Sequence, residues 1–123
     1  MLKLFVILGS LNMFLSVALG AFGAHGLKGK ISPDLLAIYQ TGVQYQMIHA
    51  IALIFIAILS DRLGAISLMN WSGWLFQIGI LLFSGSLYAL SISGIKVLGA
   101  ITPFGGVAFL LGWILLALAA IRG

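Results

Sequence analysis

Hydrophobic residues fill four long runs of this chain that contain no charged residue. The runs cover residues 4–27, 35–60, 63–95 and 97–121. Each run is longer than the roughly 18–20 residues that an α-helix needs to cross a bilayer. The pattern therefore predicts an all-α integral membrane protein with four transmembrane helices.

Capping and turn residues give the expected limits of these helices. Ser32-Pro33-Asp34 is a typical helix start, with an N-cap followed by proline and an acidic residue, and Thr102-Pro103 repeats the cap and proline. Asn70 is a further candidate N-cap, and Gly26 is a candidate C′ residue that ends the first helix. We expect helices at about 3–25, 33–60, 71–91 and 103–121. Short connections between them indicate one antiparallel four-helix bundle over residues 1–123.

Composition supports the membrane assignment and excludes several classes of function. Hydrophobic residues make up 63% of the chain and charged residues only 7%, against about 25% charged in a soluble domain. The chain has no cysteine, so disulfides, thiolate metal sites and cysteine nucleophiles are excluded. Its basic residues are isolated and lie near predicted membrane borders, which argues against binding to nucleic acid.

Membrane orientation is undetermined by the charges. Lys3, Arg62 and Arg122 fall on the side that holds both termini. The other side has the same number of basic residues, namely Lys28, Lys30 and Lys96. The positive-inside rule therefore gives no preference, and we expect only a multi-pass protein of the cell membrane, the inner membrane if the source is bacterial.

Polar residues at membrane depth are the main candidates for a functional site. With antiparallel helices that turn near residues 30 and 65, His49 is level with Asn12, and Ser84 is level with Gln46. We expect a candidate polar site in the membrane core made of Asn12, Ser16, Tyr45, Gln46, His49 and Ser84. Gln77 is placed about two turns from Ser84 along the third helix. Such a layer either binds a small molecule, ion or proton, or only links the helices by hydrogen bonds.

His25 is a secondary candidate at the membrane border. In the antiparallel arrangement it lies roughly 20 Å from His49 along the membrane normal, too far for one metal ion or haem in one chain. Asp34 and Asp61 are the only carboxylate side chains and lie at opposite borders. We therefore expect no metal site, no cofactor and no catalytic residue.

Small residues at helical spacing predict close helix packing. The candidate packing residues are Gly20, Ala24, Gly42, Gly85, Gly105 and Gly112. Small side chains allow backbones to approach closely within a chain or between chains. We therefore expect these residues to support a homo-oligomer that is also in contact with membrane lipids.

Four segments also resemble a known family. They are "LGAFGAHGL" (19–27), "YQTGVQYQMIHAIAL" (39–53), "LFSGSLYALS" (82–91) and "ITPFGGVAFLLGW" (101–113). In this order they resemble domain-of-unknown-function family 423, to which animal transmembrane protein 256 is similar. The resemblance implies a four-helix integral membrane protein without an established activity. The family-like positions are Gly20, Gly23, His25, Gly42, Tyr45, His49, Ser84, Gly85, Tyr88, Pro103 and Gly105.

Two functions are compatible with these observations. The first is a non-enzymatic membrane protein that self-associates through its small-residue helix faces. The alternative is a small transporter or channel with a polar mid-membrane site around His49. Small multidrug transporters, which have a similar size and number of spans, carry a glutamate inside the membrane, whereas this chain has none.

Overall fold

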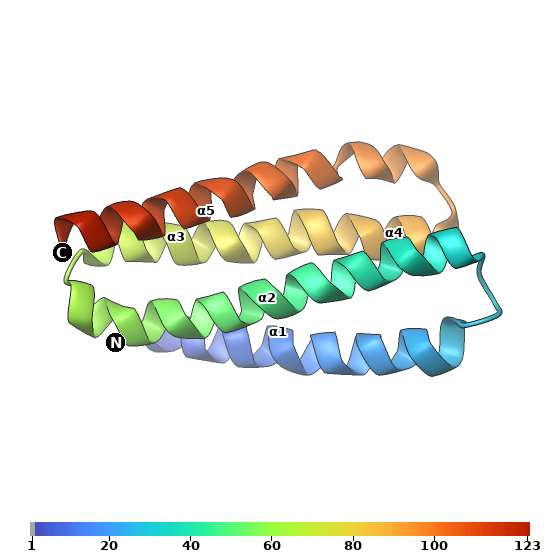
Figure 1. Ribbon diagram of the computed structural model, residues 1–123, viewed down its shortest axis with the longest axis horizontal. Coiled ribbons are helices and arrows are strands. Elements are labelled where there is room, and N and C mark those ends of the chain that lie inside the picture. The colour runs from blue at the N-terminus through green and yellow to red at the C-terminus, as the bar shows by residue number, and fades with distance from the viewer. Residues whose placement is uncertain (1) are drawn as a thin grey trace.

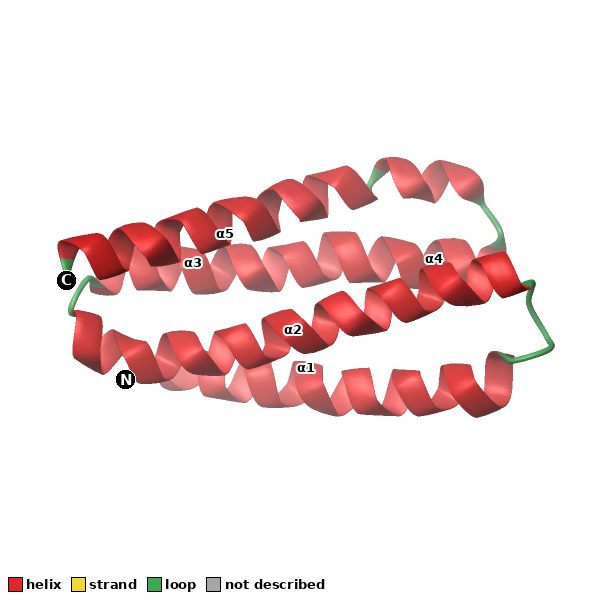
Figure 2. Ribbon diagram, viewed as in Figure 1, coloured by secondary structure: helices red, strands yellow, loops and turns green. Residues whose placement is uncertain are grey.

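The structure, a computed structural model that describes residues 2–123, consists of long helices joined by short loops (Figure 2). Four helical segments are long and apolar enough to span a membrane: Lys3–Leu27, Pro33–Leu63, Ile66–Ser93 and Lys96–Arg122. Consecutive spans run in opposite directions, and both ends of the chain lie at the same end of the bundle (Figure 1). These features confirm the predicted all-α, antiparallel, four-helix membrane fold.

The packing order follows the chain order. Helix α1 (Lys3–Phe22) packs mainly along α2 (Pro33–Leu63), and α5 (Thr102–Arg122) packs mainly along α3 (Ile66–Gly79). Helices α3 and α4 (Gly85–Ser93) also pack on α2. Helices α1 and α5 are thus at opposite edges of the bundle (Figure 1), and each has lipid-facing surface.

The second span begins as predicted, but the third begins earlier than expected. Ser32 caps α2 by accepting a hydrogen bond from the Leu35 backbone N–H at 3.2 Å. Gly64 then ends α2 in the left-handed conformation, with φ of 71°, which reverses the chain at once. Helix α3 consequently starts at Ile66, so Asn70 lies inside the helix and is not its cap.

Two single π-helical turns change the geometry of the first and third spans. The turn η1 (Gly23–Leu27) prolongs the first span past His25, so Gly26 is not the C′ residue. The turn η2 (Ile80–Ser84) joins α3 to α4 in one continuous span. A π-helical turn inserts a residue into a helix and rotates the following side chains, and such turns are frequent at functional sites.

The last span begins with a short 3₁₀ turn, η3 (Lys96–Ala100). Thr102 is the first residue of α5 and does not cap it, because Ile101 occupies the N-cap position. The Thr102 hydroxyl instead lies 2.6 Å from the Ser86 hydroxyl of α4. The expected cap is therefore a polar link between the third and fourth spans.

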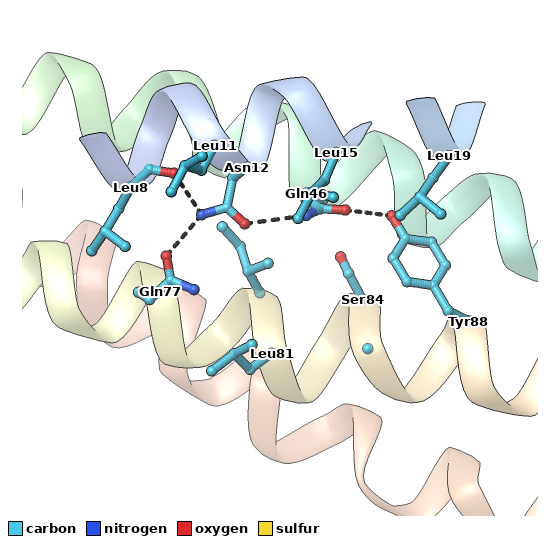
Figure 3. A pocket seen from close by; sticks show the side chains of 12 residues that line it. Leu8, Leu11, Asn12, Leu15, Leu19, Gln46, Gln77, Leu81, Ser84 and Tyr88 are labelled. Carbon is cyan, nitrogen blue, oxygen red and sulfur yellow. Dashed lines mark hydrogen bonds between the residues drawn. The ribbon is translucent and has the colours of Figure 1, made fainter. Parts of the chain in front are cut away.

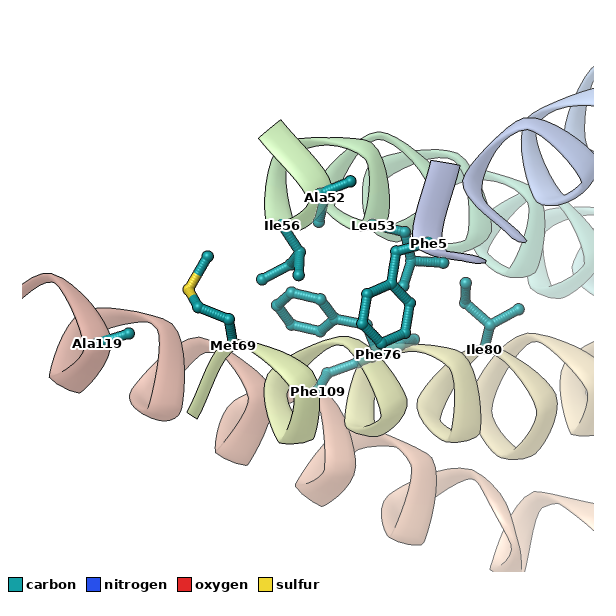
Figure 4. Close-up of a cluster of buried hydrophobic side chains, with 10 residues drawn as sticks. Phe5, Ala52, Leu53, Ile56, Met69, Phe76, Ile80, Phe109 and Ala119 are labelled. Carbon is teal, nitrogen blue, oxygen red and sulfur yellow. The ribbon is translucent and has the colours of Figure 1, made fainter. Parts of the chain in front are cut away.

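The apolar core lies between the inner faces of the helices, in the half of the bundle that holds the termini (Figure 4). Its largest fully buried members are Phe5, Leu53, Ile56, Met69 and Phe76. Beside this core lie hydrogen-bonded polar side chains from α1, α2 and the third span. The apolar packing fixes the positions of the helices that carry these polar side chains.

Candidate intramembrane binding site

Four polar side chains from three spans form one continuous chain of hydrogen bonds (Figure 3). Tyr88 donates its hydroxyl proton to Gln46 Oε1 at 2.7 Å. Gln46 Nε2 donates to Asn12 Oδ1 at 3.1 Å, and Asn12 Nδ2 donates to Gln77 Oε1 at 2.8 Å. Helices α1, α2, α3 and α4 are therefore connected through side-chain amides and one phenol.

The direction of this chain is set by one backbone carbonyl group. Asn12 Nδ2 also donates to the Leu8 carbonyl oxygen at 2.8 Å, and a carbonyl oxygen can only accept a hydrogen bond. The Asn12 amide nitrogen must therefore face Leu8 and Gln77, which leaves its oxygen toward Gln46. It follows that Gln46 presents nitrogen to Asn12 and oxygen to Tyr88, and that Gln77 presents its oxygen to Asn12.

Gln77 ends the chain with an amide group that has unused donors. Its Oε1 accepts from Asn12, whereas no described residue accepts a hydrogen bond from its Nε2. Nε2 carries two N–H groups. The amide oxygens of Asn12, Gln46 and Gln77 each accept a bond already. Each of these oxygens therefore has a partner, whereas Gln77 Nε2 has none, so the group without a partner at this end of the chain is a donor.

The polar chain lies along a groove of about 380 Å³ between α1 and the α3–α4 span. Five of its twelve lining residues are leucines: Leu8, Leu11, Leu15, Leu19 and Leu81. Its polar lining residues are Asn12, Gln46, Gln77, Ser84 and Tyr88, and none of its lining residues is charged. Such a concave apolar site with a few convergent polar groups is the usual form of a small-molecule pocket.

The site lies near the middle of the membrane. Asn12, Gln46 and Gln77 are each within three residues of the centre of their spans. At 1.5 Å of rise per residue, this places them within about 4.5 Å of the bilayer mid-plane. An amide at this depth has no water to bind and must find a partner in the protein or in a ligand.

His49 lies in a different place from the one the sequence predicted. Because Gln46, rather than His49, is opposite Asn12, the predicted layer is divided into two sites. His49 follows Gln46 by three residues, so its side chain points about 60° away around α2. There it stacks on Phe109 of α5, with ring centroids 3.6 Å apart and planes 8° apart.

Both ring nitrogens of His49 have partners within the protein. Trp113 donates its indole N–H to His49 Nε2 at 3.1 Å, and His49 Nδ1 is 2.8 Å from the Tyr45 carbonyl oxygen. An indole nitrogen only donates and a carbonyl only accepts, so His49 is neutral with its proton on Nδ1. A second groove, of about 390 Å³, opens beside these rings and includes Tyr45, whose side chain is 38% exposed.

The two predicted serines bind backbone groups. Ser16 donates to the Asn12 carbonyl oxygen and Ser84 to the Gly42 carbonyl oxygen, at 2.8 and 2.7 Å. Ser84 still lines the first groove, but its hydroxyl proton is already used. Of the predicted site residues, the structure therefore joins Asn12 directly to Gln46 and separates Tyr45 and His49 from them.

Sequence reasoning missed Gln77 and Tyr88 as members of the site. Gln77 was expected about two turns from Ser84 along the third helix and was left out of the candidate site. It is a glutamine in the middle of an apolar run, and that signal pointed to a buried partner. Tyr88 was noted only as a family-like position. Its hydroxyl reaches Gln46 because its long side chain extends back along the groove from α4.

His25 is exposed beside the first loop and contacts neither groove. Within residues 2–123 there is no group of three or more side chains of the metal-binding types that could hold an ion.

Most of the predicted small packing residues serve contacts inside one chain. Gly42 faces the Tyr88 ring, Gly105 faces the Phe83 backbone, and Gly112 faces Phe76. Gly20 approaches Val43 more loosely, and Ala24 is exposed. Gly85 differs from these, because an added Cβ would meet no atom within 4 Å and would enter the first groove.

Comparison with known proteins gives a consistent set of relatives. The family model described as protein of unknown function (DUF423) matches residues 19–106. The UPF0382 membrane protein YwdK of Bacillus subtilis (strain 168) is 54% identical over 121 residues, which is 98% of both chains. The UPF0382 membrane protein SAB0533 of Staphylococcus aureus is 52% identical over 122 residues, again 98% of both chains. No solved structure matches.

Proposed function

Since this chain belongs to the DUF423 family of proteins of unknown function and is a multi-pass membrane protein, we propose that it is a non-enzymatic binding protein for a small membrane-soluble molecule. The proposed site is the groove between α1 and the α3–α4 span. Transport would be one use of such binding, and storage or delivery within the membrane would be others.

The unused amide of Gln77 is the observation that carries this proposal. Polar groups inside a membrane usually mark a substrate path or form hydrogen bonds between helices. A purely structural network would leave no amide donor unpaired at the mid-plane, because each unsatisfied group there costs free energy. Gln77 has such a donor group beside a groove of about 380 Å³.

The alternative site around His49 has less support. His49 is only 3% exposed, and both of its ring nitrogens have partners in the protein. A ligand could therefore form a hydrogen bond with His49 Nε2 only if Trp113 first moved away. The expected transporter or channel site is better placed at Asn12, Gln46 and Gln77.

Self-association through small-residue faces also has less support than binding in the groove. Gly42, Gly105 and Gly112 are already buried against side chains or backbone of the same chain. They are therefore unavailable to a second copy. Exposed apolar residues cover the outer helices, but lipid can cover these as well as another chain can.

Photolabelling with a diazirine-bearing undecane in lipid nanodiscs tests the proposal. Adducts mapped by peptide mass spectrometry should concentrate on groove residues such as Leu11, Leu15 and Leu81, above the level on equally exposed residues elsewhere. Excess unlabelled undecane should reduce these adducts selectively. Uniform labelling of all lipid-facing residues, with no selective competition, would contradict the proposal.

Two glycine substitutions provide a blocking variant and its matched control. Gly85→Leu should fill the first groove without a clash, because an added Cβ there has open space and the backbone is helical. Gly106→Leu adds the same group to the second groove, where a Cβ would meet only Phe83 at 3.9 Å. Labelling of the first groove should fall severalfold in the Gly85 variant and stay unchanged in the Gly106 variant.

A further inference from the structure

The chemistry of the first groove also indicates which class of molecule it binds. Resting on the proposed function, we infer that the groove takes a neutral lipophile without a headgroup, whose polar group is a carbonyl oxygen, as in a ketone, quinone or neutral ester. Three independent features of the groove lead to this class: its unused donor, its lack of charge and its depth.

The unused donor selects an acceptor as the polar group of the ligand. Gln77 Nε2 offers two N–H groups and has no acceptor among the described residues. Gln46 Nε2 uses one N–H on Asn12 and lines the same groove. A carbonyl oxygen has two lone pairs and can accept from such a donor group, whereas an ammonium ion or an alkane has no lone pair with which to accept.

The absence of charge selects a neutral ligand. No lining residue of the groove is acidic or basic. All eight charged side chains of the chain lie near the ends of the spans. A carboxylate or an ammonium ion in the groove would therefore be buried without a counter-ion, which is costly at the centre of a bilayer.

The depth of the donor excludes an ordinary phospholipid as the source of the carbonyl. The hydrocarbon core is about 30 Å thick, so the ester carbonyls of phospholipids lie about 15 Å from the mid-plane. Gln77 lies within about 4.5 Å of that plane by its position in its span. Only a molecule whose polar group is free to enter the hydrocarbon core can bring an acceptor to this depth.

The shape of the groove fits a slender molecule that enters from the bilayer. Its volume of about 380 Å³ falls in the range of small-molecule sites. Leu11, Leu15 and Leu81 are exposed residues at its edge, so it opens to lipid. An alkyl chain can therefore lie along the leucines while the carbonyl reaches Gln77.

A competition series with one chain length separates these features. Methyl nonyl ketone, undecane, undecylamine and undecanoate compete with the diazirine-bearing undecane in nanodiscs, at equal mole fraction in the lipid. The ketone should compete roughly tenfold better than undecane, which corresponds to about 1.4 kcal/mol and suits one or two neutral hydrogen bonds. The amine and the carboxylate should compete no better than undecane.

Variants at Gln77 identify the donor. Gln77→Met should remove the advantage of the ketone and leave competition by undecane unchanged. If that variant does not fold, Gln77→Ser also removes the NH₂ group, and its short hydroxyl can donate to the backbone carbonyl of the preceding helical turn instead of to a ligand. The ketone should lose its advantage in this variant too, and unchanged preference for the ketone would overturn the assignment of Gln77.

The outcomes distinguish this inference from the proposed function. If undecane competes as well as the ketone and Gly85→Leu blocks both, the groove binds lipophiles but the carbonyl inference is wrong. If the amine or the carboxylate competes best, the inference is also wrong. If no compound competes and Gly85→Leu changes nothing, the proposed function itself fails.

Discussion

Asn12 is the residue whose substitution best tests whether the polar chain stabilises the bundle. It lies at the centre of the chain, accepting from Gln46 and donating to Gln77 and to the Leu8 carbonyl. Asn12→Leu keeps the number of side-chain heavy atoms and the branching at Cγ, and it removes all three side-chain bonds at once. We expect this variant to be less stable, although leucine is far more apolar and lies in a membrane.

The expected loss follows from the bonds that the structure shows. Two of them join different spans, and hydrogen bonds of this kind contribute about 0.6 kcal/mol each in membrane proteins. Gln46, which is 4% exposed, would also lose the acceptor of its amide nitrogen. An unsatisfied buried donor costs about 1–3 kcal/mol. The sum is a loss of about 2–4 kcal/mol in the free energy of unfolding.

The assay is reversible unfolding in mixed micelles, followed by circular dichroism, with a double-mutant cycle. Gln46→Leu is combined with Asn12→Leu, so that the orphaned amide of Gln46 is removed in the double variant. The two single losses should then exceed the loss of the double variant by about 0.6–1.7 kcal/mol, the range of couplings between polar side chains in membranes.

Asn70→Leu is the matched control, because Asn70 is exposed on α3 near the end of its span. The same substitution there should change stability by less than about 0.5 kcal/mol. The reasoning would be refuted if Asn12→Leu were as stable as the wild type. It would also be refuted if the Asn12 and Gln46 effects were additive, since additivity means that the two side chains do not interact in the folded protein.

Other parts of the structure give three further predictions. Trp113→Phe should lower the free energy of unfolding by about 1–2 kcal/mol, because His49 Nε2 loses its donor. In the wild type, ¹⁵N NMR should show the His49 ring proton on Nδ1, and a proton on Nε2 would contradict this geometry. Gly112→Leu should lower the free energy of unfolding by about 1–3 kcal/mol or prevent folding of the bundle, because an added Cβ would lie 2.6 Å from the Phe76 ring. A variant as stable as the wild type would show that α3 and α5 pack differently. Ser32→Ala should cost about 1 kcal/mol and speed hydrogen exchange of the first turn of α2, and unchanged exchange would argue against the cap.

Helix α2 connects the two polar sites of the molecule. Gln46 faces the groove beside α1, and His49, one turn further on, faces α5. The two sites are therefore on neighbouring faces of one helix, and within residues 2–123 no hydrogen bond joins the side chains of Gln46 and His49. Effects of substitutions at His49 on the groove should accordingly be small unless α2 itself moves.

The four spans and their antiparallel order could be predicted from the sequence alone. Uncharged runs of more than 20 residues have only one stable arrangement in hydrocarbon, because a helix satisfies every backbone polar group within its own segment. The Ser32 cap was predictable for a similar reason, since its hydrogen bond is local. By contrast, the start of α3 depended on the left-handed turn at Gly64, and Asn70 gave a misleading signal.

The site could be predicted only in part. Asn12 and Gln46 were identified because glutamine and asparagine are costly in lipid and must find partners. Which partners they find depends on how far one helix slides along another and on how each is rotated. In the structure Asn12 is opposite Gln46 and not His49, a difference of three residues in the register of α1 against α2, and His49 lies against Phe109. Residue types and spacing thus determine the spans and the polar residues within them, whereas the partners of those residues depend on packing between helices, which no local pattern records.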